Sequence, residues 1–385
     1  MRNNLLTRRV VEIIEKKHLE KKLQSGEKLR VKLGIDPNKR ALHLGHAVTL
    51  WKLREFQDAG HTAVFIIGDW TAQIGDPSEK AETRERLSKA DIRKNVDYFF
   101  SRTEKILDKN KLEIHLQSEW FGKFGLAELI ELTAKTTVSQ LMAHETFRKR
   151  LKEGKQFLGY EMLYPLLQGY DSVAVRADVE LGALEQKFNL LMGRRVQKGF
   201  GQEPQDAVLV DYLIGLDGKE KMSKSLNNYV AITDPPAEMF GKVMSIPDGL
   251  IKHYFELCTN VAEKEIKNIS KERPREQKIR LAKEIVELYH GGKKAADAEK
   301  EFNKKFGKEK GEVKADFELK KKPGSYLLSD ILAEGKLASS KSEARRKVGE
   351  GAVEHNGNKI IDERAEIKIK TGDLLRLGKR FLRIK

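Results

Sequence analysis

Two short motifs in this 385-residue chain place side chains that suit phosphate chemistry at close spacing. The first, HLGH at 43–46, stands where an apolar stretch gives way to helical periodicity. His43 and His46 are three residues apart, so on a helical turn they point the same way. A helix N-terminus in this position also presents free N–H groups and the positive end of a dipole, which favour a phosphate.

The second motif, KMSKS at 221–225, follows a Gly-Leu-Asp-Gly turn. Lys221 and Lys224 are three residues apart on an expected loop, with glycine upstream to serve as a hinge. Mobile lysines suit a triphosphate whose charge is redistributed during a reaction. Taken singly, two histidines are compatible with a structural role and two lysines with a solvated loop, whereas the two motifs together indicate nucleotide chemistry.

The segments around the first motif predict how it is positioned. Residues 31–36 (VKLGID) read as a strand, 43–61 as a helix and 63–69 (AVFIIGD) as a buried parallel strand. Strand, helix and strand in this order form a βαβ unit, which predicts an α/β fold with a doubly wound parallel sheet. The N-terminal 23 residues are expected to form a first helix, and further strands are expected at 112–117, 172–179 and 207–213.

The composition changes at Asp234-Pro235-Pro236. From there to about residue 318 the chain is rich in Lys and Glu, and it is expected to be helical without strands. A third unit is expected over 324–385, with two helices followed by short strands around Asn356-Gly357, which is a strong hairpin signal.

Charge and cysteine content narrow the class of protein. Lys and Arg number 74 against 58 Asp and Glu, and residues 261–385 hold 33 of the basic and 22 of the acidic residues. This excess indicates a polyanionic partner such as RNA, although a solvated surface would give the same composition. The single cysteine, Cys258, excludes a disulfide framework and a cysteine zinc site. With no signal-peptide pattern and no run of 18 apolar residues, we expect a soluble cytoplasmic protein without a membrane partner.

The two motifs, in this order and about 175 residues apart, resemble the ATP-binding motifs of class I aminoacyl-tRNA synthetases. The rest of residues 31–232, and the chain onward to its C-terminus, resembles the bacterial tyrosyl-tRNA synthetases. This resemblance implies a Rossmann-like catalytic domain over 1–232, a helical domain over 233–318 that binds the anticodon region, and a small α+β S4-like RNA-binding domain over 324–385. It also implies a homodimer whose interface lies at about 120–165.

The segment 164–171 (YPLLQGYD) carries the resemblance to the tyrosine enzymes in particular. Tyr164, Gln168 and Asp171 are spaced i, i+4 and i+7, so they share one helical face. The resemblance implies that Tyr164 and Gln168, together with Asp76, hold the amino group of tyrosine. It implies that Asp171 accepts a hydrogen bond from the phenol, so phenylalanine would leave a buried carboxylate unpaired. Gln186 corresponds to a residue that contacts the substrate or the ribose.

The remaining roles also come from the resemblance. It implies L-tyrosine and tRNA(Tyr) as substrates, with ATP as co-substrate accompanied by Mg²⁺ and no metal held by the protein. Stabilisation of the transition-state charge is assigned to His43, His46, Lys80, Arg84, Lys221 and Lys224. ATP binding is assigned to Gly34, Asp36, Asn38, His43, Gly45, His46, Thr49, Glu185, Lys221, Met222, Ser223, Lys224 and Ser225. RNA binding is assigned to Lys341, Arg345, Arg346 and Lys347.

Three positions depart from the family pattern. Lys32 stands where many bacterial members have a tyrosine that contacts the substrate phenol, and Asn38 stands in place of the usual threonine near the γ-phosphate. In the run 182–186 (GALEQ), Glu185 is one methylene longer than the ribose-binding aspartate of the family. Two alternatives stay open: activation of another amino acid, tryptophan being the nearest, and an RNA-binding or regulatory protein that has kept the fold without the activity.

Overall fold

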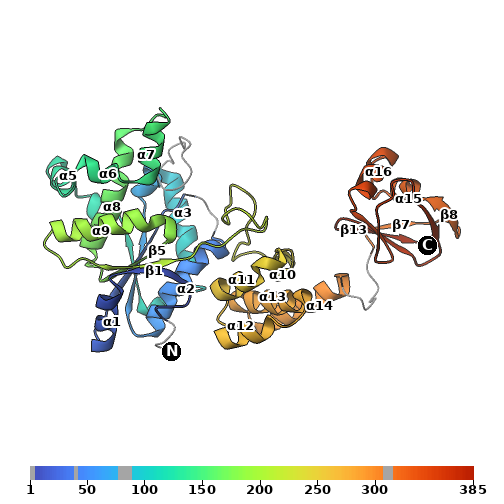
Figure 1. The fold of residues 1–385 in the computed structure, drawn as a ribbon, viewed down its shortest axis with the longest axis horizontal. Helices are drawn as coiled ribbons and strands as arrows, with labels where there is room; N and C mark the ends of the chain where they lie inside the picture. Colours follow the sequence, from blue (N-terminus) through green and yellow to red (C-terminus); the bar gives the residue numbers. More distant parts are fainter. Residues whose placement is uncertain (1–4, 39–41, 77–88, 307–314) are drawn as a thin grey trace. The chain divides into compact units, whose positions relative to one another are not determined.

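The computed structural model describes residues 5–38, 42–76, 89–306 and 315–385. It divides into two compact units, Met1–Glu299 and Lys300–Lys385 (Figure 1). The first unit contains a sheet covered by helices and a following all-helical segment, and the second contains small sheets with two helices.

A six-stranded sheet in the order β1-β6-β5-β2-β3-β4 forms the centre of the first unit. All neighbouring strands are parallel except β1, which runs antiparallel to β6. Its inner strands are almost completely buried, as expected for strands covered by helices on both faces. The strands are β1 (Val10–Ile14), β2 (Arg30–Ile35), β3 (Thr62–Ile67), β4 (Leu112–Leu116), β5 (Val179–Ala183) and β6 (Asp206–Val210).

The predicted βαβ unit is confirmed, since β2 leads into a long helix that returns the chain to the parallel strand β3. That helix, α2, begins directly after His43 and packs against β2, β3 and β5. The helices of this part are α1 (Lys16–Ser25), α2 (Leu44–Asp58), α3 (Lys89–Thr103), α4 (Ser118–Phe121), α5 (Leu126–Thr133), α6 (Val138–Leu141), α7 (Glu145–Lys152), α8 (Tyr164–Ala174) and α9 (Lys187–Gly199).

Two expected elements were wrong. The N-terminus does not form one helix, because the β-branched run within β1 pairs with β6 at the sheet edge before α1 begins. The expected strand at 172–179 is the end of α8, a turn at Arg176 with a positive φ, and only then β5. The apolar residues that suggested a strand, Val175 and Ala177, are buried against β3 instead.

The all-helical segment consists of α10 (Pro236–Met244), α11 (Ile251–Cys258), α12 (Glu263–Ile269), α13 (Pro274–His290) and α14 (Gly292–Phe306). The sequence predicted a strand-free region as far as 318, but β7 (Phe317–Leu319) pairs in parallel with β13. The chain therefore enters the C-terminal sheet before Pro323, because the apolar side chains of β7 pack on the core of that unit.

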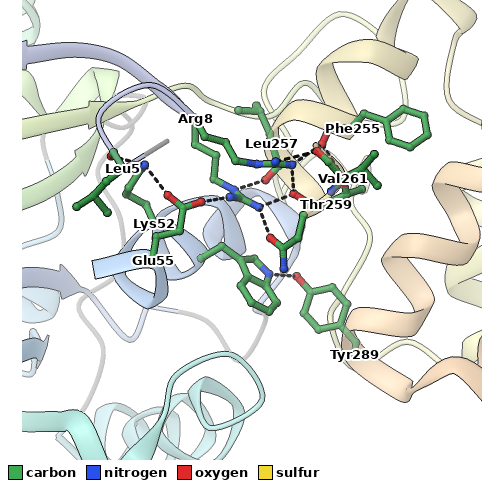
Figure 2. Close-up of polar contacts among 12 residues, drawn as sticks. Leu5, Arg8, Lys52, Glu55, Phe255, Leu257, Thr259, Val261 and Tyr289 are labelled. Atoms are coloured by element: carbon green, nitrogen blue, oxygen red, sulfur yellow. Dashed lines mark hydrogen bonds and ion pairs between the residues drawn. The ribbon is translucent and has the colours of Figure 1, made fainter. Parts of the chain in front are cut away.

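Two arginines next to β1 join the sheet part to the helical segment (Figure 2). The last carbonyl groups of α11 have no partner within the helix and carry the negative end of its dipole. Arg9 donates from Nε to the Leu257 carbonyl at 2.8 Å and from Nη2 to the Thr259 carbonyl at 2.7 Å, and Arg8 donates to the Val261 carbonyl at 2.8 Å. These guanidinium groups therefore bond to the end of α11 and to the turn that follows it.

Helix α2 contributes the counter-charge for this joint. Glu55 forms ion pairs with Arg9 and, at 2.6 Å, with the fully buried Lys52, whose ammonium also donates to the Leu5 carbonyl at 2.8 Å. Trp51 Nε1 donates to the Tyr289 hydroxyl of α13 at 3.0 Å (Figure 2). The helix that begins at HLGH is thus bonded at its other end to the helical segment.

The second unit confirms the expected small α+β fold. Its helices are α15 (Leu328–Glu334) and α16 (Lys341–Gly349), and its sheets have the orders β10-β9-β12-β13-β7 and β11-β8. The predicted hairpin turn is present, with positive φ angles of 50° at Asn356 and 84° at Gly357. The remaining strands are β8 (Gly324–Leu327), β9 (Val353–His355), β10 (Asn358–Ile360), β11 (Glu366–Ile369), β12 (Leu374–Leu377) and β13 (Arg380–Ile384).

We predict that Arg9→Met destabilises the first unit strongly. The change removes the donor to two carbonyl groups and leaves Glu55 without one of its cations, and breaking a buried pair in this way costs ~3–5 kcal/mol. Urea unfolding followed by circular dichroism measures the loss. Arg93→Met on the exposed face of α3 is the matched control and is expected to change stability little. Equal stability of the two variants would show that the joint is not held by Arg9.

Candidate active site

A cavity of about 560 Å³ opens at the carboxyl ends of the parallel strands. The chain leaves β2 through α2 toward β3 and β4, whereas β5 continues to β6 on the other side of β2. In open α/β sheets such a change of direction leaves a crevice in which ligands bind. Residues from the ends of β2, β3 and β5 and from the loop after β4 line it: Gly34, Asp36, Gly68, Gln117, Gly182 and Glu185.

Most of the residues singled out from the sequence line this one cavity. They are Gly34, Asp36, Asn38, His43, Gly45, His46, Thr49, Asp76, Tyr164, Gln168, Asp171, Glu185, Gln186, Lys221, Met222, Ser223, Lys224 and Ser225. Lys80 and Arg84 lie outside the described residues. Lys341, Arg345, Arg346 and Lys347 lie on α16 of the second unit.

Asp36 links the two halves of the cavity at the end of β2. Its carboxylate accepts hydrogen bonds from the Thr71 hydroxyl at 2.6 Å and from the Tyr164 hydroxyl at 3.0 Å. Space for these contacts depends on Gly68, because a Cβ there would lie 2.2 Å from Asp36 Oδ1. A predicted nucleotide-binding residue and a predicted tyrosine-binding residue are therefore bonded directly to each other.

The HLGH motif forms the N-terminus of α2, as predicted. His43 is the N-cap residue in an extended conformation, and its ring lies 3.9 Å from that of His46. Gly45 allows this approach, because a Cβ there would lie 3.0 Å from the His43 ring and 3.6 Å from Met222 Cβ. Burial, and then the nearby His46 and Lys221 charges, hold the pKa of His43 well below its usual value, so this imidazole is neutral.

The KMSKS loop is anchored by buried contacts on one side and presents polar side chains to the cavity on the other. Met222 is buried, and its N–H donates to the Leu213 carbonyl at 2.7 Å. Asn228 holds the loop from below by accepting from the Ser223 N–H at 2.7 Å and donating to Asp217 at 2.6 Å. Lys221 forms an ion pair with Glu185, the residue that departs from the family pattern. This ion pair connects the loop to the turn that follows β5.

Asp171 lines the cavity and is 2% exposed. It accepts from Gln117 Nε2 at 2.7 Å and from Trp120 Nε1 at 3.1 Å. Gln117 is oriented for this bond, because its oxygen accepts from the Thr71 N–H at 2.9 Å. Burial raises the pKa of Asp171 to about 7, against the lowering effects of the Lys32 charge and of the two hydrogen bonds.

No motif in the sequence marked Gln117, which directly follows β4, or Trp120 in α4. Their position at the carboxyl end of a parallel strand was the one available clue. Asp76 and Gln186 also form a pair, since Gln186 Nε2 donates to the Asp76 carboxylate and its oxygen accepts from Asn189 at 2.9 Å. Two residues that were each predicted to bind the substrate are thus hydrogen-bonded to each other.

Comparison with known proteins identifies the family. The family of tRNA synthetases class I (W and Y) matches residues 24–307. A tyrosine–tRNA ligase of Moorella thermoacetica is 44% identical over 387 residues, which cover 98% of this chain and 93% of that relative. One of Carboxydothermus hydrogenoformans is 46% identical and covers 97% and 93%. The chain belongs to the class I tyrosyl-tRNA synthetases.

Solved structures share the fold. The tyrosyl-tRNA synthetase complexed with L-tyrosine from Archaeoglobus fulgidus aligns with a TM-score of 0.61 at 22% identity, over 77% of this chain and 98% of that one. A C-terminally truncated mitochondrial tyrosyl-tRNA synthetase from Aspergillus nidulans aligns with a TM-score of 0.66 at 18% identity, over 77% and 91%. The predicted α/β fold class is confirmed.

None of the helices that the structure describes is both long and apolar enough to cross a membrane. In the same part of the chain, no three His, Cys, Asp or Glu side chains gather in an arrangement that could hold a metal ion.

We predict that Asp171 makes stability depend on pH. Its carboxyl has a pKa of about 7 in the folded chain and 3.8 as the reference value, so the protonated form favours folding. This contribution is fully present below about pH 4 and is lost as the pH rises through 7. Relative to Asp171→Asn, the wild type is expected to lose ~3 kcal/mol of unfolding free energy between pH 5 and pH 8. Urea titrations at both pH values measure it, and a constant difference would contradict it.

Proposed function

We propose that the protein activates L-tyrosine with ATP to tyrosyl-adenylate and pyrophosphate, and then transfers the tyrosyl group to the 3′-terminal adenosine of tRNA(Tyr). The observation that carries the proposal is the single cavity lined by HLGH, by KMSKS and by the polar face of α8. The relatives named as tyrosine–tRNA ligases, which match over nearly the whole chain, support the same reaction.

Tyrosine occupies the inner half of this cavity. Its phenol donates to Asp171, whose two present hydrogen bonds leave acceptor capacity on each oxygen. Its ammonium group lies among Asp76, Tyr164 and Gln168. Because Asp171 is buried, phenylalanine would leave the carboxylate without this partner, and the site disfavours it for that reason. An indole would also lack a hydroxyl in this position.

ATP occupies the outer half, with Mg²⁺ as the counter-ion of its phosphates. A carboxylate oxygen of tyrosine attacks the α-phosphate, and pyrophosphate leaves with the electron pair of the broken bond. Lys221 and Lys224 stabilise the charge that develops on the leaving group. His43 acts there as a neutral hydrogen-bond donor, because burial disfavours its protonated form. Lys221 exchanges its ion pair with Glu185 for the phosphates when ATP binds.

Catalysis by such a site consists of positioning and charge stabilisation, and it uses no protein nucleophile. By resemblance to the family, Lys80 and Arg84 bind the leaving pyrophosphate. The all-helical segment binds the anticodon region, and the second unit is an S4-like domain. ATP and tRNA meet in the cytoplasm, where we place the protein.

Tyrosine-dependent ATP–pyrophosphate exchange tests the proposal. We expect exchange with tyrosine, and a kcat/KM lower by orders of magnitude with tryptophan or phenylalanine. Exchange with none of the three would contradict the enzyme function and favour an RNA-binding protein without activity. A preference for tryptophan would retain the reaction and overturn the assignment of the substrate.

Asp171→Ala is the specificity control in the same assay. Loss of a hydrogen bond to a charged group costs up to ~3 kcal/mol, so the tyrosine-to-phenylalanine ratio is expected to fall roughly a hundredfold. ATP affinity is expected to survive. If ATP binding is lost together with tyrosine binding, Asp171 serves the stability of the fold instead.

We also propose a homodimer formed by the segment 120–165. Apolar side chains there are unusually open to solvent: Leu126 is 73% exposed, Ile130 58% and Val138 68%. Exposed apolar residues that cluster along one segment indicate a protein interface. Leu126→Glu with Ile130→Glu is expected to give a monomer by analytical ultracentrifugation, whereas Ile361→Glu in the second unit keeps the dimer. A monomeric wild type would overturn the proposal.

The second unit binds tRNA through α16. Arg345 and Arg346 are exposed on it; Lys341 pairs with Asp330, and both Arg346 and Lys347 pair with Glu350. In the double variant Arg345→Ala and Arg346→Ala, the slope of log Kd against log salt concentration is expected to fall by ~2, since each phosphate contact contributes ~0.9. An unchanged slope in a filter-binding titration would place the RNA contacts elsewhere.

A further inference from the structure

A buried ion pair that no motif revealed lies next to Gln168, which lines the cavity. Lys32 of β2 and Glu180 of β5 are 0% and 1% exposed at their side chains, and their charged atoms lie 2.9 Å apart. Lys32 is one of the departures from the family pattern, and Glu180 belongs to none of the sequence motifs. Neither residue lines the cavity. Charges buried this deeply are expensive unless they are fully bonded.

The pair is bonded on every side. Lys32 Nζ also donates to the Ser172 hydroxyl at 2.7 Å and to the Gln168 carbonyl of α8 at 3.0 Å. The second oxygen of Glu180 accepts from Gln205, which precedes β6. Helix α9 makes room for this network with Gly193, because a Cβ there would lie 2.6 Å from Gln205 Nε2 and 3.1 Å from Glu180 Oε2.

One further bond connects the network to the substrate site. Gln168 Nε2 donates to Glu180 Oε1 at 3.2 Å. A carboxylate only accepts hydrogen bonds, so it selects the NH₂ end of the Gln168 amide and turns the carbonyl oxygen away from itself. Gln168 lines the cavity, and that oxygen is the end of the amide suited to an ammonium group.

We propose that Glu180, held by Lys32, is a positioning residue that fixes the side-chain amide of Gln168 so that its oxygen faces the α-ammonium group of the substrate. This inference rests on the proposed binding of tyrosine in the cavity. Without the carboxylate, nothing fixes the amide in this orientation, and its oxygen is no longer held toward the ammonium group. Gln117 is oriented by the same means, with Thr71 selecting the end that faces Asp171.

The charges of the pair must be removed together in a test. Lys32 lowers and Glu180 raises the pKa of Asp171, so a single neutral substitution would also disturb the phenol end of the site. The double variant Lys32→Met with Glu180→Met removes both charges, whose effects on Asp171 oppose each other, and leaves Gln168 Nε2 without an acceptor at position 180. Replacing a buried ion pair by apolar groups of similar volume is often tolerated by the fold.

Three ligands that all carry the phenol distinguish effects at the ammonium end of the substrate from effects at the phenol end. Tyrosine and tyramine carry the ammonium group, and 3-(4-hydroxyphenyl)propionate lacks it. By isothermal titration calorimetry, we expect the double variant to bind tyrosine and tyramine roughly tenfold more weakly and the propionate unchanged, because one hydrogen bond to a charged group is lost. Equal weakening of all three, with a lower melting temperature, would show a purely structural pair and overturn the inference.

A double-mutant cycle shows whether Glu180 acts through Gln168. In a Gln168→Ala background, the same double change is expected to leave the Kd for tyrosine unaltered, and additive losses would contradict the mechanism. If the double variant does not fold, Glu180→Asp replaces it, since the shorter side chain keeps the charge and withdraws from Gln168. Absence of tyrosine-dependent exchange in the wild type would count against the proposed function. If a folded variant binds tyrosine and tyramine as tightly as the wild type does, only the role of Glu180 is contradicted.

Discussion

The parallel alignment of β2 with β5 is the constraint on which the site depends. The chain leaves these neighbouring strands in opposite directions, so their carboxyl ends remain uncovered and form the floor and rim of the cavity. Asp36 follows one strand and Glu185 follows the other. Helix α2 starts at this edge with HLGH, and α8 faces it with Tyr164 and Asp171. Displacing one of these strands along the other would separate the nucleotide side from the amino-acid side.

Within this frame, amide side chains connect charged groups to the substrate site. Gln117 takes its orientation from Thr71 and offers a donor to Asp171, while Gln168 takes its orientation from Glu180. An amide has a donor end and an acceptor end, so a single fixed partner determines what it presents on its other side. In the proposed function, specificity for a zwitterionic, phenolic ligand thus depends in part on Glu180, which does not line the cavity.

The sequence predicted what is local and missed what depends on strand order. HLGH and KMSKS were recognisable because each functions within a few residues, and the spacing of Tyr164, Gln168 and Asp171 follows from one helix. The partner of Lys32 was not predictable, because Glu180 is remote in the sequence and becomes adjacent only when β5 pairs with β2. The N-terminal helix was wrong for a similar reason, since β1 forms through its pairing with β6.

Helix α2 carries two sets of contacts, and their side chains must keep a fixed relative orientation around the helix axis. His43 and His46 occupy its first turn, while Trp51, Lys52 and Glu55 bond to Tyr289, the Leu5 carbonyl and Arg9. One residue inserted between these groups would rotate the later ones by about 100° and shift them by about 1.5 Å. The histidines and the joint would then face incompatible directions. The length of this helix is therefore as constrained as its sequence, and changes of chain length have to be accommodated in loops elsewhere.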